Sequence, residues 1–231
     1  MKVSSSISAI LGFPGELWLA FITYLPGQVG FKLRSLYWGR KLGALGDKAM
    51  IDVGVHFSNP AHIFIGRRTW IDRGVILLAG PDRGERPKRV LRNPRFKGHP
   101  GEIHIGACVH IAPYCLVSGI GGVSIGDNCG LASGCKVFSF SHHFRSQENP
   151  DSHEVFFTMF APPEHQFLLE GPVTLEDNVG LASNVIVLPG AAIGKESFIT
   201  VGSVVMSTIP GNSIAGGNPA KRLQPRFPDG S

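Results

Sequence analysis

Hydrophobic residues recur at every sixth position in four separate stretches of the chain. The phased residues are all Ile, Leu or Val: Ile65, Ile71, Leu77; Ile105, Ile111, Val117; Ile125, Leu131, Val137; and Leu175, Leu181, Val187, Ile193, Ile199, Val205. Because six is a multiple of two, these side chains share one face of extended strands, whereas a helix of 3.6 residues per turn would scatter them around its surface. The pattern therefore predicts strands and excludes helices in these stretches.

A second, usually smaller residue stands four positions after most of the phased residues. It is Thr69, Val75, Val109, Cys115, Gly121, Cys129, Cys135, Ser141, Val179, Val185, Ala191, Ser197 or Ser203. Large and small inward residues alternating on short strands suit a narrow solenoid, in which three hexapeptides close one coil of about 18 residues. The 30 glycines and 17 prolines supply the turns. The predicted fold is an all-β solenoid of parallel strands.

Three sequence features resemble the left-handed β-helix acyltransferases, also called the hexapeptide-repeat family. They are the hexapeptide pattern, the tract VSIGDNCGLASGCKVFSFSHHF at residues 123–144, and the closing GGNPAKRL at residues 216–223. The similarity is to sugar O-acetyltransferases of the galactoside, maltose and colanic-acid types, and it covers about residues 60–224. The left hand of the solenoid is implied by this resemblance, because parallel crossovers are normally right-handed.

We expect three regions along the chain. Residues 1–50 lack the pattern and form a partly helical N-terminal cap, residues 51–215 form the left-handed β-helix, and residues 216–231 form a C-terminal tail. Long insertions interrupt the β-helix at about residues 80–101 and 143–172, and such insertions usually carry binding.

The N-terminal region has two candidate roles. The apolar run at residues 16–25 is too short to span a bilayer, and Pro14 and Pro26 interrupt or bound it. A short helix is expected within residues 28–45. We favour a cap over the open first coil. The alternative is a membrane-surface anchor, for which Lys32, Arg34, Arg40 and Lys41 offer positive charge.

The cysteines indicate a core rather than a metal or disulfide site. Cys115, Cys129 and Cys135 occupy small inward positions, and no CxxC or Cys/His spacing typical of zinc is present. We therefore expect no metal and a location in the reducing cytoplasm. If the N-terminal region is a membrane anchor, the protein would lie at the inner face of the membrane.

The basic first insertion has two interpretations. It binds the phosphates of a cofactor or an anionic glycan, or it is an exposed, solvated loop without a ligand. It does not favour nucleic acid, because it lacks interleaved aromatic residues and the net charge is only +5.

His142 is the candidate catalytic base, and His143 is its rival. His142 ends a hexapeptide directly before the second insertion, and the tract before it aligns without gaps on the family motif, whose histidine at this place is the base. Imidazole, with a pKa near 6.5, can accept the proton of a sugar hydroxyl that attacks a thioester. The partner of its other nitrogen stays open between a backbone carbonyl and Glu148, Asp151, Glu154, Glu164 or Glu170. Because three cysteines are assigned to the interior, we predict direct transfer without an acyl-enzyme.

The resemblance also implies contacts with substrates. Coenzyme A contacts are expected at Ser183, Val201, Met206, Ser207 and Lys221, with Arg222 or Arg226 replacing a basic residue that relatives carry where this chain has Gln224. His110, Tyr114 or Ser118 stands where relatives place an acceptor-binding asparagine, and His143 is also expected to bind the acceptor. The family usually forms trimers with the active site between neighbouring solenoids, so a homotrimer is expected.

The predicted function is therefore acetyl-CoA-dependent O-acetylation of a sugar or glycan precursor, as in polysaccharide biosynthesis. N-acetylation of an amino sugar stays open, because one base serves both. Two other classes are a metal-dependent hydratase on the same solenoid and a non-catalytic scaffold. The histidines available to a hydratase are His104, His110, His142, His143, His153 and His165.

Overall fold

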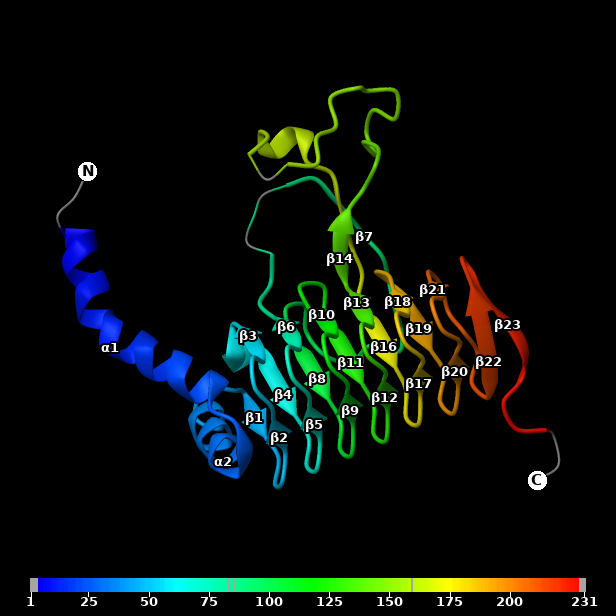
Figure 1. Cartoon of the computed structure of the whole chain (residues 1–231). Coiled ribbons are helices and arrows are strands. Elements are labelled where there is room, and N and C mark those ends of the chain that lie inside the picture. The colour runs from blue at the N-terminus through cyan, green and yellow to red at the C-terminus, as the bar shows by residue number, and fades with distance from the viewer. Residues whose placement is uncertain (1–3, 83, 85, 159, 229–231) are drawn as a thin grey trace.

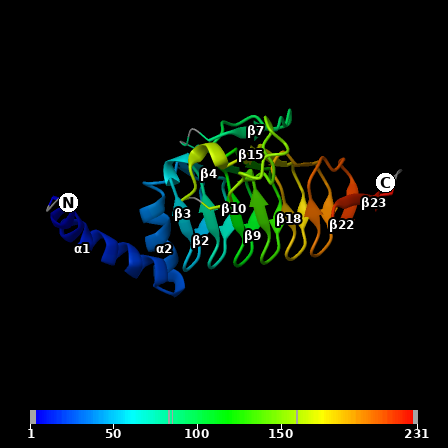
Figure 2. The ribbon, with the colours of Figure 1, turned by 90° about the horizontal axis from the view of Figure 1, so that it is seen from above.

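A computed structural model describes residues 4–82, 84, 86–158 and 160–228. Two helices stand at one end of a long stack of short strands, and two loops rise from one edge of the stack (Figure 1). Seen from above, the helices and the final strand β23 lie at opposite ends (Figure 2). The strands are mostly parallel and repeat coil by coil, so the predicted solenoid is confirmed.

Three sheets form the sides of the solenoid, and the chain visits them in the order A, B, C in each coil. Sheet A contains β1 (Ala44–Leu45), β4 (Ile63–Ile65), β8 (Ile103–Ile105), β11 (Val123–Ile125), β16 (Val173–Leu175) and β19 (Ala192–Ile193). Sheet B contains β2 (Met50–Ile51), β5 (Trp70–Ile71), β9 (His110–Ile111), β12 (Gly130–Leu131), β17 (Gly180–Leu181), β20 (Phe198–Ile199), β22 (Ser213–Gly217) and β23 (Ala220–Pro225). Sheet C contains β3 (His56–Ser58), β6 (Ile76–Leu78), β10 (Leu116–Ser118), β13 (Lys136–Phe138), β18 (Ile186–Val187) and β21 (Val204–Val205).

The coil length changes along the stack. In the middle of the molecule Ile103 pairs with Val123, an offset of 20 residues, whereas near the end Leu181 pairs with Ile199, an offset of 18. The longer coils hold two inward residues on each sheet A strand, such as Val123 and Ile125. The expected length of 18 therefore holds for the last coils only.

The core runs along the axis of the solenoid. Every phased aliphatic residue is buried, and so are the thiols of Cys115, Cys129 and Cys135. One inward assignment is wrong: Ser139 is fully buried, whereas Ser141 is exposed on β14 (Phe140–His142). The chain leaves the coil two residues earlier than the hexapeptide phase predicts, because β14 pairs with a strand of the second insertion instead of with the solenoid.

The N-terminal helices are held to the first coil by one buried arginine. Helix α1 (Ser4–Tyr24) continues through Pro14, which we expected to interrupt it, and α2 (Gly27–Trp38) ends well before residue 45. The Arg34 guanidinium donates from Nη1 to the carbonyls of Ile22 and Leu25 at 3.0 and 2.7 Å, and from Nε to that of Ile51 at 2.8 Å. It thereby joins α1, α2 and β2.

None of the helices in the described part of the chain has the length and apolar character needed to cross a membrane. The far end of the solenoid is closed by the antiparallel hairpin of β22 and β23. Two single-turn 3-10 helices, η1 (Pro60–His62) and η2 (Pro163–His165), lie in connections.

Candidate functional site

The two insertions, which are far apart in sequence, form one platform above the corner between sheets C and A. Strand β14 pairs antiparallel with β15 (Leu168–Glu170), and β15 pairs in parallel with β7 (Lys88–Val90) of the first insertion. The Lys88 ammonium bridges to the Glu170 carboxylate at 2.7 Å. The Arg86 guanidinium lies 5.8 Å from the Phe140 ring centre. The first insertion therefore supports the strand that carries His142.

His142 ends β14 with an exposed side chain. Its ring stands edge-on to Phe157 at a centroid distance of 6.1 Å, and its backbone is opposite the buried Leu168 in the strand pair. Among the described residues, no hydrogen-bond partner of the His142 ring is found. Of the insertion carboxylates, Glu170 is paired with Lys88, and Glu154 lies 3.6 Å from His165 Nδ1. The platform fixes the backbone of His142 and leaves its imidazole facing outward.

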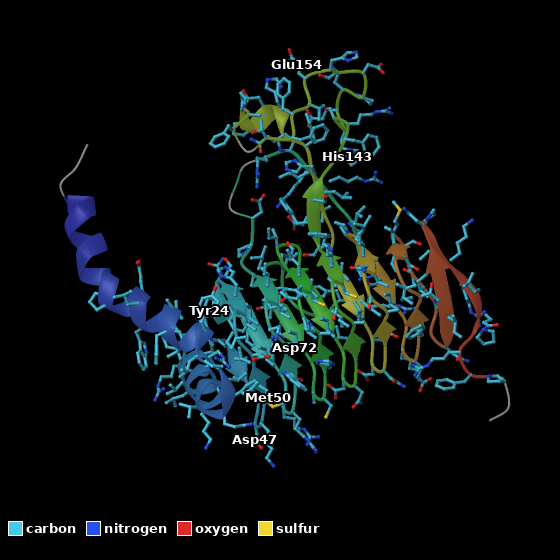
Figure 3. The ribbon with its side chains drawn as sticks, viewed as in Figure 1. Tyr24, Asp47, Met50, Asp72, His143 and Glu154 are labelled. Carbon is cyan, nitrogen blue, oxygen red and sulfur yellow. The ribbon has the colours of Figure 1, made fainter. Side chains whose placement is uncertain are left out.

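His143 has a different environment. Its Nδ1–H donates to the Arg145 carbonyl at 2.6 Å, and its ring stacks on Phe144 at 4.7 Å. Its backbone N–H donates to the Phe167 carbonyl at 2.8 Å. Nε2 accepts from the Gln147 amide at 3.4 Å. His143 is therefore tied to the insertion itself, and Figure 3 shows it on the raised loop, well away from the solenoid body.

A shallow groove of about 550 Å³ lies on the outer face of sheet B. The outward residues of successive strands form a ladder in register: Met50, Trp70, His110, Gly130, Gly180, Phe198 and Ile214. Two neighbouring glycines interrupt a row of large side chains. They form the floor, and His110 and Phe198 form the two walls.

His110 is oriented by its neighbours in this groove. Its Nε2 lies 3.4 Å from the Asp72 carboxylate, and its ring lies 5.3 Å from that of Trp70. Ser133 and Ser183 line the same groove at the corner between sheets B and C. The groove thus offers an imidazole, two hydroxyl groups and a bare backbone floor, which suits a slender polar ligand.

Tyr114, Ser183 and Val201 all lie along the corner between sheets B and C. The Gly202 N–H donates to the Ser183 carbonyl at 3.0 Å, which places Val201 one coil beyond Ser183. Tyr114 is 68% exposed, and its ring covers Gly74, where an added Cβ would lie 2.8 Å from the ring. Ser118, in contrast, is buried on β10.

The remaining predicted cofactor residues lie near the end of the solenoid. Met206 and Ser207 are exposed directly after β21, on the side of the corner between sheets C and A. Lys221 and Arg222 lie exposed on β23, opposite Gly216 and Ala215. The Arg226 guanidinium instead donates to the Asn178 carbonyl at 3.0 Å.

A single chain does not bring all of these residues together. His142 stands at the corner between sheets C and A, whereas His110 and Ser183 line the face of sheet B. Figure 3 shows the same separation between His143 on the loop and Asp72, the partner of His110, on the solenoid. Sequence reasoning missed Asp72, Trp70, Phe198 and the two glycines. The residues directly before the phased aliphatic residues of sheet B include two consecutive glycines, and this sequence signal could have indicated the groove.

Three of the cysteine thiols are packed in the core, and several cations of the first insertion form ion pairs within the fold. A hydrogen bond to Cys135, together with burial, raises the pKa of the Cys115 thiol, and burial raises the pKa of Cys129 to about 11. Arg86 pairs with Asp82 at 2.7 Å and Arg95 with Glu176 at 3.2 Å. Part of the basic run is thus used in ion pairs. Within the described residues, no three His, Cys, Asp or Glu side chains converge as a metal site would require.

Comparison with known proteins gives several curated relatives that match over more than half of the chain and several similar folds. No family model matches the chain. A putative lipopolysaccharide biosynthesis O-acetyl transferase, WbbJ of Escherichia coli, is 33% identical over 124 residues, which are 54% of this chain and 61% of the relative.

Two solved structures match over most of their length. AntD, an N-acyltransferase from Bacillus cereus in complex with dTDP and coenzyme A, has a TM-score of 0.67 at 20% identity, covering 88% of this chain and 92% of AntD. A hexapeptide-repeat acetyltransferase from Vibrio cholerae, complexed with acetyl coenzyme A, has a TM-score of 0.53 at 22% identity, covering 96% and 90%.

These findings confirm the resemblance to the hexapeptide-repeat acyltransferases and the left-handed β-helix fold. The matched segments span only 26% to 61% of the first three curated relatives, all of which carry acetyltransferase names. The structural matches are below 25% identity and establish the fold alone.

Proposed function

We propose that the protein is an acetyl-CoA-dependent O-acetyltransferase that modifies a hydroxyl of a sugar or glycan precursor. The observation that carries the proposal is the position of His142 at the end of a braced strand, directly after the tract that resembles the family motif. The names of WbbJ and of the acetyl coenzyme A complex from Vibrio cholerae support the same reaction class.

In the proposed reaction His142 accepts the proton of the acceptor hydroxyl while the oxygen attacks the acetyl thioester. The tetrahedral intermediate then collapses, the carbon–sulfur bond breaks, and the imidazolium returns the proton to the departing thiolate of coenzyme A. No protein nucleophile is needed. The high pKa of Cys129 and the burial of Cys115 and Cys135 support direct transfer.

Coenzyme A is proposed to lie along the corner between sheets B and C, near Ser183 and Val201. Lys221 and Arg222 are exposed on β23 at the end of this path and would meet its phosphates. Met206 and Ser207 lie at a different corner of the same chain, so they would contact coenzyme A bound mainly by a neighbouring subunit. The acceptor is proposed to occupy the groove of His110 on sheet B, with Tyr114 at the adjoining corner between sheets B and C.

A homotrimer is part of the proposal, because one chain separates His142 from the groove of sheet B. In an assembly with threefold symmetry, the corner between sheets C and A of one subunit would face the corner between sheets B and C of the next. The platform of one subunit would then carry His142 to the groove of its neighbour.

The decisive experiment measures thiol release from acetyl-CoA with a panel of free, nucleotide-linked and lipid-linked sugars. We expect His142→Ala to lower kcat by about 10² to 10⁴, the usual contribution of a general base. His143→Ala tests the rival, and His104→Ala, a partly exposed histidine on the outer face of sheet A, is the control.

The competing functions give other results. Transfer only to amino sugars would show that the reaction is N-acetylation instead of O-acetylation. AntD is named an N-acyltransferase. If kcat falls more in His143→Ala than in His142→Ala, the general base is His143 instead of His142. Absence of turnover together with absence of coenzyme A binding in calorimetry would favour the scaffold, and activity that needs added metal would favour the hydratase.

A further inference from the structure

Helix α1 has an apolar face that nothing in the described chain covers. Ile22 is buried and Leu19 packs on the core, so one side of the helix rests on the solenoid. Leu17, Trp18, Phe21 and Tyr24 lie on another side and are 55%, 49%, 52% and 71% exposed. Their spacing places them along one stripe of the helix. Exposed apolar patches of this kind usually mark an interaction surface.

Helix α2 continues this surface with a different composition. Val29, Lys32 and Leu36 follow one another on α2 at intervals of three or four residues, on the side opposite the buried Arg34 and Trp38, and Arg40 lies in the turn directly after the helix. Val29 is 63% and Leu36 57% exposed. Aliphatic and cationic residues thus alternate along one stripe, and Arg40 is held there by a hydrogen bond from Nη1 to the Leu36 carbonyl at 3.0 Å.

The charge of this region is positive on balance. Within residues 14–47 the acidic residues are Glu16 and Asp47, the latter in a groove beside Lys32 and Leu36, whereas Lys32, Arg34, Arg40 and Lys41 are basic. Arg34 is used internally, which leaves three exposed cations. Such a surface is complementary to a negatively charged partner.

The two helices are fixed rather than loosely attached. Arg34 bonds to carbonyls of α1, of the segment after it and of β2, so the angle between the helices and the first coil is set by one buried side chain. Figure 1 shows α1 leading away from the end of the solenoid, opposite β23 and away from the platform of His142.

We propose that α1 and the outer side of α2 form a membrane-docking surface for a bilayer that contains anionic lipid. The surface consists of Leu17, Trp18, Phe21, Tyr24, Val29, Lys32, Leu36 and Arg40. Trp and Tyr favour the headgroup region, aliphatic side chains enter the acyl boundary, and Lys and Arg contact lipid phosphates. A second copy of the chain fits less well, because like-charged cations would meet across the contact. This inference is independent of the proposed acetyltransfer.

The test is flotation of the full chain with vesicles of phosphatidylcholine, compared with vesicles that also contain phosphatidylglycerol. We expect binding to the anionic vesicles and a loss of about tenfold or more in Lys32→Glu/Arg40→Glu, since both cations would contact lipid phosphates and both substitutions reverse the charge. A matched pair, Arg67→Glu/Lys195→Glu, reverses two exposed cations at the corner between sheets A and B and should bind like the wild type.

Fluorescence reports the apolar part of the contact. The three tryptophans are Trp18, Trp38 and Trp70, and only Trp18 belongs to the docking surface. Anionic vesicles should shift the emission to shorter wavelength in the wild type and not in Trp18→Phe, which keeps the fold.

Equal binding by both charge-reversal pairs, or no binding to either vesicle, would overturn the proposal. A fall in oligomer mass in Leu17→Ser/Phe21→Ser without any vesicle binding would assign the surface to a second copy instead. Turnover with a soluble acceptor should be unchanged in Lys32→Glu/Arg40→Glu, so failure of docking is distinct from failure of the proposed reaction.

Discussion

The four cysteines have contrasting surroundings, although all of them lie within hexapeptide repeats of the solenoid. Cys115 and Cys135 lie in stacked coils and donate to the Ala132 and Ala182 carbonyls at 3.2 and 3.1 Å, and Cys129 lies in the core. Cys108, one position away from the inward row, is exposed at the corner between sheets A and B. A shift of a single residue therefore separates an inert interior thiol from an accessible one.

We predict that Ellman's reagent modifies one thiol per native chain near neutral pH and all four thiols after denaturation. Burial holds the pKa of Cys129 at about 11, so its thiolate is scarce until the pH rises toward that value or the core opens. Cys108→Ser should remove the fast reaction and leave acetyl-CoA turnover intact. Rapid modification in Cys108→Ser would show that the core thiols are accessible and would reopen an acyl-enzyme route.

Most inward residues could be predicted from the sequence, because the period of six fixes which side of a strand each residue takes. Ser141 shows where this reasoning stops. The phase assigns it to the core, yet it is exposed, because β14 gives up the solenoid register to pair with β15, almost thirty residues later. Local periodicity holds no information on such distant pairing. The candidate base His142 could be named from its motif, but its braced strand could not be foreseen.

Among the elements, the groove of sheet B depends on two consecutive strands that present glycine outward. An added Cβ at Gly130 would have nothing within 4 Å, whereas at Gly180 it would lie 2.9 Å from the Phe198 ring. Glycine is not required by the backbone here, since neither residue has a positive φ. Glycine also weakens a strand, so the gap costs stability. Its value to the protein is the space that it leaves.

Gly130→Val should therefore fold at least as well as the wild type and lose function. We expect an unchanged or higher melting temperature, because valine favours strands and meets open space. The kcat/KM of the proposed transferase should fall about tenfold or more, since the side chain fills the floor between His110 and Phe198. Ser124→Val, on the outer face of sheet A, is the matched control. Full activity in Gly130→Val would remove the groove from the site.

The two insertions show how elements cooperate. The first insertion was expected either to bind phosphate or to be a solvated loop, but β7 completes the sheet that carries β14, and Lys88 pairs with Glu170. Its cations are thus partly structural. Sequence alone could not join the segments, because parallel pairing between residues about 80 positions apart has no local signature.

At the scale of the whole molecule, the outer face of sheet C is unusually apolar. Ile76, Leu116, Ile186 and Val204 lie outward in register along it, and the same row holds His56 at its start and Lys136 in its middle. Each is partly exposed in the isolated chain. A flat apolar face running the length of the solenoid is well suited to burial against other copies. It borders both corners that the proposed site would need from neighbouring subunits.

We predict that Leu116→Glu/Ile186→Glu converts the assembly into single chains of 24.8 kDa in light scattering, whereas the wild type has the mass of three chains. Burying two carboxylates at a contact between copies costs several kcal/mol, because they lose their hydration without gaining partners. Ser124→Glu, which adds a charge to the face of sheet A, should leave the assembly intact. A wild type of single-chain mass would contradict the assembly directly.

Mixing two impaired variants then tests whether the site is shared. His142→Ala lacks the proposed base, and Gly130→Val lacks the groove. If the base of one subunit serves the groove of the next, trimers refolded from an equal mixture contain some sites in which both parts are native. The activity of the mixture should therefore rise above that of either variant alone. Had both parts come from one chain, every site would carry one defect or the other, and mixing would restore nothing.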